Sequence, residues 1–115
     1  MNHYRWNDIT LEQMNPLFAR SVVHGDRLTL ARVYMKKGCK VPLHHHENEQ
    51  ISAVFKGSLR FEVGGEERVV AAGELVHIPA GVPHLAEAME DTECLDIFNP
   101  VREDWRRGDD AYLRG

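Results

Sequence analysis

Short runs of alternating apolar and polar residues, separated by glycine or proline, extend through most of this 115-residue chain. Alternation with a period of two is typical of β-strands that bury one face. Gly25-Asp26 and Gly64-Gly65 are typical hairpin turns, and the composition of 79–83 indicates another turn. Roughly nine short strands at regular spacing predict an all-β sandwich or barrel.

The expected strands lie at 17–24, 27–35, 50–55, 59–63, 67–72, 75–78, 84–89 and 93–98, with a further one at His44. The spacing of Thr10 and Gln13 resembles a capping box, which predicts a single helical turn there. A chain of this length can close one small barrel and has nothing left for a second domain. We therefore expect one domain over 1–115, with a barrel core at about 17–100 and a charged, solvated tail at 101–115.

Charge and composition exclude several classes of protein. The net charge is −4, and such a surface does not attract nucleic acid. No apolar run approaches the roughly 18 residues that a membrane-spanning helix needs, so no membrane partner is expected. Two cysteines, Cys39 and Cys94, are too few for a disulfide-stapled secreted scaffold. We expect reduced thiols and a cytoplasmic protein.

Histidine is enriched, with seven residues, and four of them are His44, His45, His46 and His84. Side chains at i and i+2 of a strand share a face, so His44 and His46 can reach one point inside a barrel. His84 follows a Pro/Gly turn and is expected to join them from a separate strand. We interpret His3 and His24 as exposed or terminal residues and His77 as a half-buried strand residue.

Three residues are candidates for the third metal ligand, the amide of Gln50 and the carboxylates of Glu49 and Glu47. Gln50 has the parity of His44 and His46 if the strand runs straight. A bulge would instead bring Glu49 or Glu47 to that position. Three neutral imidazoles and an amide oxygen leave the charge of a metal uncancelled, which favours polarisation of a substrate oxygen. Such a donor set suits one divalent ion, Zn, Ni, Fe or Mn, without choosing among them.

The strand at 93–98 contributes a possible acid or base. Cys94, Asp96 and Phe98 share one face, and Leu95 and Ile97 share the other, which we expect to pack against the second sheet or a partner. A carboxylate inside a barrel needs a cation or hydrogen bonds, so Asp96 beside a metal becomes a candidate general acid/base. The alternative is an exposed aspartate on an edge strand.

Two further side chains have alternative interpretations. Phe98 is either core or an apolar wall for a substrate. Arg102 can clamp a carboxylate through two hydrogen bonds, or it forms an ion pair with Glu103, Asp104 or a neighbouring loop.

The spacing of these residues resembles two motifs of the cupin family. Gly38-x5-His44-x-His46-x3-Gln50-x6-Gly57 resembles the first motif, with Gln in the usual Glu place, and Gly73-x5-Pro79-x-Gly81-x2-His84 resembles the second. The final Asn of the second motif is missing, since Ala88 stands there. The resemblance implies a jelly-roll cupin barrel, a metal at its centre and a homodimer. The fold by itself does not identify a reaction, because many functions share it.

Longer segments are similar to the KdgF family of small cupins, namely His-His-His-Glu-Asn-Glu-Gln-Ile-Ser, Val-His-Ile-Pro-Ala-Gly-Val-Pro-His and Leu-Asp-Ile-Phe-Asn-Pro-Val-Arg-Glu-Asp-Trp. That family converts 4,5-unsaturated monouronates from pectin or alginate into linear ketonised sugars. The resemblance implies an anionic sugar substrate, metal ligands at His44, His46, Gln50 and His84, and catalytic residues at Asp96, Phe98 and Arg102. The alternatives are a metal-dependent cupin dioxygenase or oxidase, and a non-catalytic binding module for a sugar or carboxylate.

Overall fold

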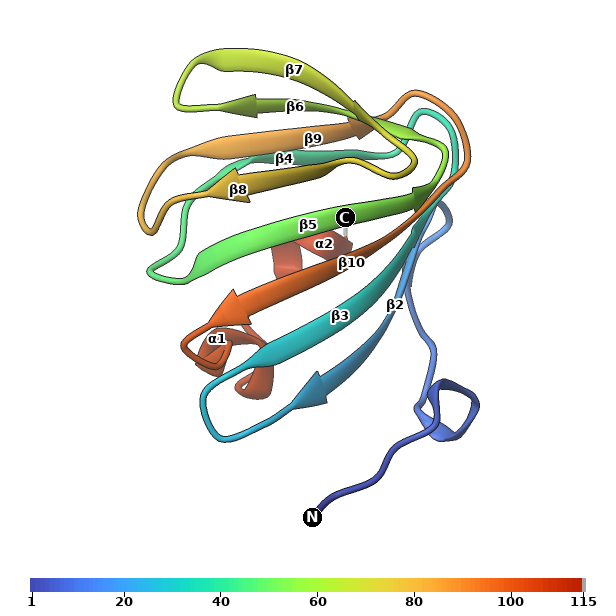
Figure 1. Cartoon of the computed structure of the whole chain (residues 1–115), viewed down its shortest axis with the longest axis vertical. Helices are drawn as coiled ribbons and strands as arrows, with labels where there is room; N and C mark the ends of the chain where they lie inside the picture. Colours follow the sequence, from blue (N-terminus) through green and yellow to red (C-terminus); the bar gives the residue numbers. More distant parts are fainter. Residues whose placement is uncertain (115) are drawn as a thin grey trace.

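A computed structural model describes residues 1–114 as two antiparallel sheets that face each other (Figure 1). The elements in chain order are the 3-10 turn Trp6–Asp8, β1 (Glu12–Asn15), β2 (Phe18–His24), β3 (Thr29–Met35), β4 (Lys40–His44), β5 (Glu49–Lys56), β6 (Ser58–Val63), β7 (Glu66–Ala71), β8 (Leu75–Ile78), β9 (His84–Ala88), β10 (Thr92–Asn99), α1 (Glu103–Arg106) and α2 (Ala111–Arg114). One sheet has the order β1-β2-β3-β10-β5-β8 and the other β4-β9-β6-β7. This jelly-roll arrangement agrees with the predicted all-β barrel.

The turns lie where the sequence predicts them. Gly64 and Gly65 both have positive φ, 56° and 83°, in the tight turn between β6 and β7. Glycine adopts this left-handed conformation without the steric penalty that a Cβ would bring. The hairpin places Val63 opposite Glu66, and the register that follows puts alternate side chains of both strands on the inner face.

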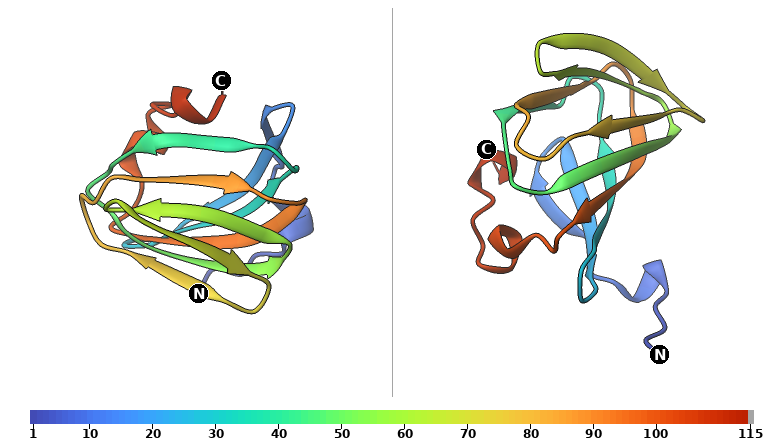
Figure 2. Two further views of the ribbon diagram at one scale, coloured as in Figure 1. Left: turned by 90° about the horizontal axis from the view of Figure 1, so that it is seen from above. Right: turned by 60° about the vertical axis from the view of Figure 1, so that its left-hand side comes forward.

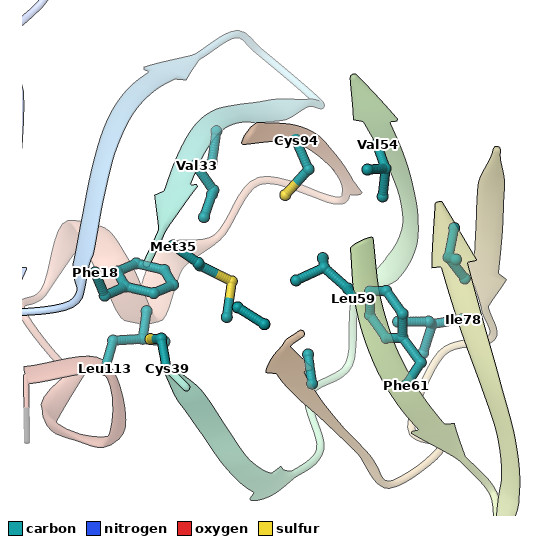
Figure 3. Packing of buried hydrophobic residues seen from close by; sticks show 14 of the residues in the cluster. Phe18, Val33, Met35, Cys39, Val54, Leu59, Phe61, Ile78, Cys94 and Leu113 are labelled. Atoms are coloured by element: carbon teal, nitrogen blue, oxygen red, sulfur yellow. The ribbon is translucent and has the colours of Figure 1, made fainter. Parts of the chain in front are cut away.

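Buried apolar side chains from both sheets fill the space between the layers (Figure 3). Val33 and Cys94 come from the larger sheet, and Leu59 and Phe61 come from the smaller one. Leu113 of α2 joins the same cluster, so the end of the chain is part of the core.

The N-terminal segment differs from its prediction. The expected helical turn at 10–13 is wrong, because the residues from Glu12 onward form β1 and pair with β2, and the only helical turn before β1 is the 3-10 turn at Trp6–Asp8. Backbone pairing with an adjacent strand satisfies more backbone groups than an isolated helical turn does, so the tertiary context overrides the local signal.

The C-terminal segment is the second departure, because it is folded against the barrel and part of it is buried, including Arg102, Asp110 and Leu113. The α2 helix contacts β1 and β4, which are the edge strands of the two sheets on one side of the barrel (Figure 2). The side chain of Asn15 donates a hydrogen bond to the Leu113 carbonyl at 2.8 Å. Among residues 1–114, no helix is long and apolar enough to cross a membrane.

Candidate metal centre and its cavity

Three histidines converge from different parts of the smaller sheet. His44 ends β4, His84 begins β9, and the two stand opposite each other in the strand register. His46 lies in the turn that follows β4, and its ring centroid is 5.6 Å from that of His44 and 4.8 Å from that of His84. One ligand nitrogen from each ring lies within 4.8 Å of the others. The structure therefore brings together the three histidines that the sequence singled out.

Backbone carbonyls fix the orientation of each ring. The Nδ1 atoms of His44, His46 and His84 lie 2.7, 3.0 and 2.8 Å from the carbonyl oxygens of Pro42, Asn48 and Val82. A carbonyl only accepts, so each Nδ1 carries a proton and each Nε2 of a neutral ring has a free lone pair. The backbone thus selects the tautomer in which all three Nε2 atoms are ready to bind a cation.

Burial keeps these rings neutral. It lowers the pKa of His44 and of His46 to about 4, and it lowers the pKa of His84 below its ordinary value. The positive charge of Arg102 acts in the same direction on all three. The Nε2 atom of His84 is buried and has no hydrogen-bond partner within the described part of the chain. A buried lone pair without a partner is costly in the absence of a cation.

Gln50 stands next to this group. Its Oε1 lies 3.2 Å from His46 Nε2, while its amide nitrogen donates to Ser52 Oγ at 2.9 Å. The chain turns between β4 and β5, so the two segments do not form the straight strand on which the parity argument was based. Glu47 and Glu49 are exposed, and Glu49 pairs with His77 at 2.7 Å. Of the three alternatives, only Gln50 faces the histidines.

This donor set fits one divalent cation. Three imidazole nitrogens and an amide oxygen suit zinc, nickel, iron or manganese, and the unpartnered Nε2 of His84 is the atom that such an ion would satisfy. The remaining histidines lie elsewhere. His3 and His45 are exposed, His24 is half-buried beside Thr29, and His77 is exposed and not half-buried as expected.

Asp96 lies on the inner face of β10, a central strand between β3 and β5. The alternative of an exposed aspartate on an edge strand is therefore wrong. Ser52 Oγ donates to Asp96 Oδ1 at 2.6 Å. Burial raises the pKa of Asp96 to about 6, because the hydrogen bond from Ser52 and the charge of Arg102 offset the loss of solvation only in part.

The two faces of β10 are reversed relative to one sequence-based expectation. Cys94 and Phe98 are buried between the sheets, whereas Leu95 and Ile97 are half-buried on the outer face of the larger sheet. Leu95 and Ile97 therefore do not pack against the second sheet. The face of β10 that carries Cys94, Asp96 and Phe98 lines the cavity between the sheets. Leu95 and Ile97 therefore point to the opposite, outer side.

Arg102, just after β10, packs against two adjacent aromatic rings. Its guanidinium carbon lies 4.7 Å from the ring centroid of Phe98 and 4.2 Å from that of Trp105. Two of its nitrogens donate to the Asp104 carboxylate at 2.9 and 2.8 Å. The expected ion pair with Asp104 therefore exists, and Arg102 is 1% exposed.

The folded tail supplies two cavity residues that the sequence reasoning missed, Trp105 and Tyr112. The rings of His44 and Tyr112 have centroids 4.8 Å apart. Two bulky aromatic residues are unusual in a solvated tail, and their presence is the sequence signal that could have indicated a packed segment. A buried ion pair between Arg20 and Asp110, at 2.5 Å, attaches the segment to β2, and hydrogen bonds from Arg114 and Arg20 outweigh the effect of burial and lower the pKa of Asp110.

One cavity of about 50 Å³ connects these groups. Its lining includes His44, Gln50, Ser52, His84, Asp96, Phe98, Arg102, Trp105 and Tyr112. A cavity needs roughly 10–15 Å³ for one water molecule, so this space suits a carboxylate and its neighbouring atoms. A whole sugar ring would extend beyond these side chains or displace α2.

Comparison with solved structures shows that most of the chain is similar to two proteins of comparable length. KdgF from Halomonas sp. superposes with a TM-score of 0.85 at 27% sequence identity, covering 91% of this chain and 98% of that one. An RmlC-like cupin from Shewanella frigidimarina NCIMB 400 also gives a TM-score of 0.85, at 25% identity, covering 91% and 96% of the two chains.

Sequence comparison adds a curated relative and a family. Mannose-1-phosphate guanylyltransferase ManC from Salmonella typhimurium strain LT2 is 32% identical over 69 residues, which are 58% of this chain and 14% of that protein. The chain thus spans a small part of this relative. The family described as Cupin domain matches residues 31–98, more than half of the chain, including all three histidines. The chain belongs to the Cupin domain family.

Proposed function

We propose that this protein is a metal-dependent enzyme that converts 4,5-unsaturated monouronates into linear ketonised sugars by ring opening and tautomerisation. The observation that carries the proposal is the placement of Asp96 and Arg102 in the cavity that His44, His84 and Gln50 line, next to the group of three histidines. A proton-transferring group, a cation and a metal-binding group are what this reaction needs at one place. The similarity to Halomonas KdgF over almost its full length supports the same proposal.

The proposed metal ligands are His44, His46, Gln50 and His84. A divalent ion bound there supplies Lewis-acid stabilisation of an oxygen on which negative charge develops. No electron transfer is required, so several divalent ions would serve.

Asp96 is the proposed proton carrier. Its carboxylate accepts the proton of the anomeric hydroxyl as the C1 carbonyl forms and the bond between C1 and the ring oxygen breaks. The ring oxygen remains on C5 as an enolate, and return of the same proton from Asp96 to C4 gives the C5 ketone, so the product is an isomer of the substrate. A pKa of about 6 lets Asp96 alternate between its two protonation states near neutral pH.

Phe98 and Arg102 shape the cavity around the reacting atoms. Phe98 is 2% exposed and forms an apolar wall. Arg102 uses Nε and Nη2 in its hydrogen bonds to Asp104, and the described part of the chain offers no acceptor to its Nη1. We propose that this free edge of the guanidinium meets the substrate carboxylate.

The decisive experiment is an assay of the purified protein with unsaturated galacturonate and unsaturated mannuronate. The expected result is loss of the absorbance of the conjugated double bond, abolished by a chelator and restored by one of zinc, nickel, iron or manganese. Asp96→Asn is expected to bind metal like the wild type and to lose turnover.

The two alternative functions give different outcomes in the same experiment. Turnover that requires Fe(II) and consumes O₂ would indicate a dioxygenase or oxidase. Metal binding without turnover of either sugar, but with saturable binding of a carboxylate, would indicate a binding module. Either result would overturn the proposed ketonisation.

The proposed partners are a small anionic sugar and a second copy of the chain. The outer face of the larger sheet exposes Ile51, Phe55 and Leu75, which are 38%, 62% and 66% exposed. An exposed apolar patch of this kind supports the expected homodimer, which light scattering of the purified protein would test. Cytoplasmic localisation stays a prediction.

A further inference from the structure

The hydroxyl oxygen of Tyr112 accepts two hydrogen bonds from other side chains of the protein. It accepts hydrogen bonds from Arg102 Nη2 at 2.8 Å and from Trp105 Nε1 at 3.3 Å. A phenolic hydroxyl offers two lone pairs and one proton. The proton remains, and residues 1–114 provide no acceptor for it. Toward a ligand in the cavity, Tyr112 therefore acts as a donor.

Arg102 also acts only as a hydrogen-bond donor toward a ligand in the cavity. Its Nε and Nη2 are occupied by Asp104 and Tyr112, while Nη1 has no acceptor in the described part of the chain. Both side chains line the cavity, so this wall presents N–H and O–H groups and no free acceptor. Such a wall attracts an oxygen that carries negative charge and disfavours a group that must itself donate.

The size of the cavity agrees with this selectivity. About 50 Å³ accommodates a carboxylate and the atoms next to it better than a sugar ring. The aromatic rings of Phe98 and Trp105, which contact each other edge to face, both pack against Arg102 and hold its guanidinium in one orientation. The donor groups are thus preorganised, which reduces the entropy lost when an anion binds.

We infer that Tyr112, together with Arg102, forms a carboxylate-binding subsite in which Tyr112 is a specificity-determining residue that selects uronic acids over neutral sugars. This inference rests on the proposed function for the identity of the sugar. It assigns a role to the C-terminal segment, which brings Tyr112 to the cavity because Arg20 and Asp110 anchor α2 to β2.

The test is calorimetric binding of two unreactive sugars to the protein as purified with its metal. D-galacturonate carries the carboxylate, and D-galactose has a neutral hydroxymethyl group in its place. In Tyr112→Phe we expect the affinity for galacturonate to fall about 3- to 10-fold, the size of one lost hydrogen bond, and the affinity for galactose to change less than about 2-fold. Tyr34→Phe, at a hydroxyl outside this cavity, is the matched control and should change neither affinity.

The relative loss of affinity for the two sugars distinguishes a specificity-determining role of Tyr112 from a purely structural one. An equal loss for both sugars would show that Tyr112 only supports the fold, and unchanged galacturonate binding in Tyr112→Phe would overturn the subsite. Failure of the wild type to prefer galacturonate over galactose would overturn it as well. Absence of turnover with unsaturated uronates, combined with a selective loss of galacturonate binding, would refute the proposed reaction and leave the subsite standing.

A crystal structure of the wild type with galacturonate provides a measurement that does not depend on the variant folding. Carboxylate oxygens within hydrogen-bonding distance of Tyr112 Oη would support the subsite. A carboxylate bound elsewhere would overturn it.

Discussion

The buried carboxyl of Asp96 is expected to destabilise the metal-free protein at neutral pH. Burial raises its pKa from an ordinary value of 3.8 to about 6. Between these two pH values the folded protein retains a proton that the unfolded chain has released, so the free energy of unfolding falls as the pH rises. Below pH 4 the penalty is absent, and above pH 6 it is complete.

Asp96→Asn should therefore stabilise the metal-free protein above pH 6. A shift of about two pKa units corresponds to about 3 kcal/mol at 1.36 kcal/mol per unit. This value is an upper limit, because the Asp96 residue as a whole is only half-buried and screening by solvent reduces such a penalty. The asparagine carbonyl can still accept the hydrogen bond from Ser52, so the substitution removes the charge and leaves the contact.

The assay is urea unfolding with chelator present, at a series of pH values from 3.5 to 8. The difference between Asp96→Asn and wild type should be near zero at the acid end and rise to a plateau of about 1–3 kcal/mol above pH 6. Asp26→Asn, an exposed carboxyl in the turn between β2 and β3, is the control and should follow the wild type. A variant that is equally stable or less stable than wild type at pH 8 would refute the reasoning.

Three other predictions concern the metal centre and the tail. His84→Ala removes one of three converging nitrogens and should lower metal affinity at least about 100-fold, measured by competition with a chromogenic chelator. Ser52→Ala releases the amide of Gln50 and should lower metal affinity about 10- to 100-fold in the same assay, as loss of an outer-shell partner typically does; unchanged affinity would show that Ser52 does not orient this ligand. Asp110→Asn removes the nearer charged partner of the buried Arg20, whose other carboxylate partner, Glu12, lies 3.5 Å away, and should cost about 3 kcal/mol near pH 7. The pKa of Asp110 is lowered in the folded state, so this stabilisation is present above the ordinary pKa of 3.8 and is lost as the pH falls below it. The free energies of unfolding of wild type and variant should therefore converge in acid. A constant difference in urea unfolding down to pH 2.5 would contradict the ion pair.

The strands and the histidine group could be predicted from the sequence because both depend on local spacing. Alternation sets which side chains share a face, and glycine at a tight turn sets where a strand ends, as Gly64 and Gly65 show. His44, His46 and His84 could be assigned to one site because their motif spacing is specific. Gln50 lies beside the histidines, as predicted, although the chain turns between β4 and β5.

The tail could not be predicted because its structure depends on distant partners. Its helices are four residues each and too short to show a helical period. The pair that anchors them joins Arg20 to Asp110, 90 positions apart, and charged residues usually indicate solvent exposure. Long-range contacts of this kind, Arg20 with Asp110 and Asn15 with Leu113, help to place Tyr112 at the site.

The contact of α2 with the edge strands β1 and β4 has a consequence for the order of folding. The hydrogen bond from Asn15 to Leu113 joins positions 98 apart, so it can form only after position 113 has left the ribosome. Until then the barrel has an open seam with two unpaired strand edges, which are templates for association with other chains. Contacts of such high sequence separation also slow folding. The nascent chain should therefore be most prone to aggregation just before α2 docks.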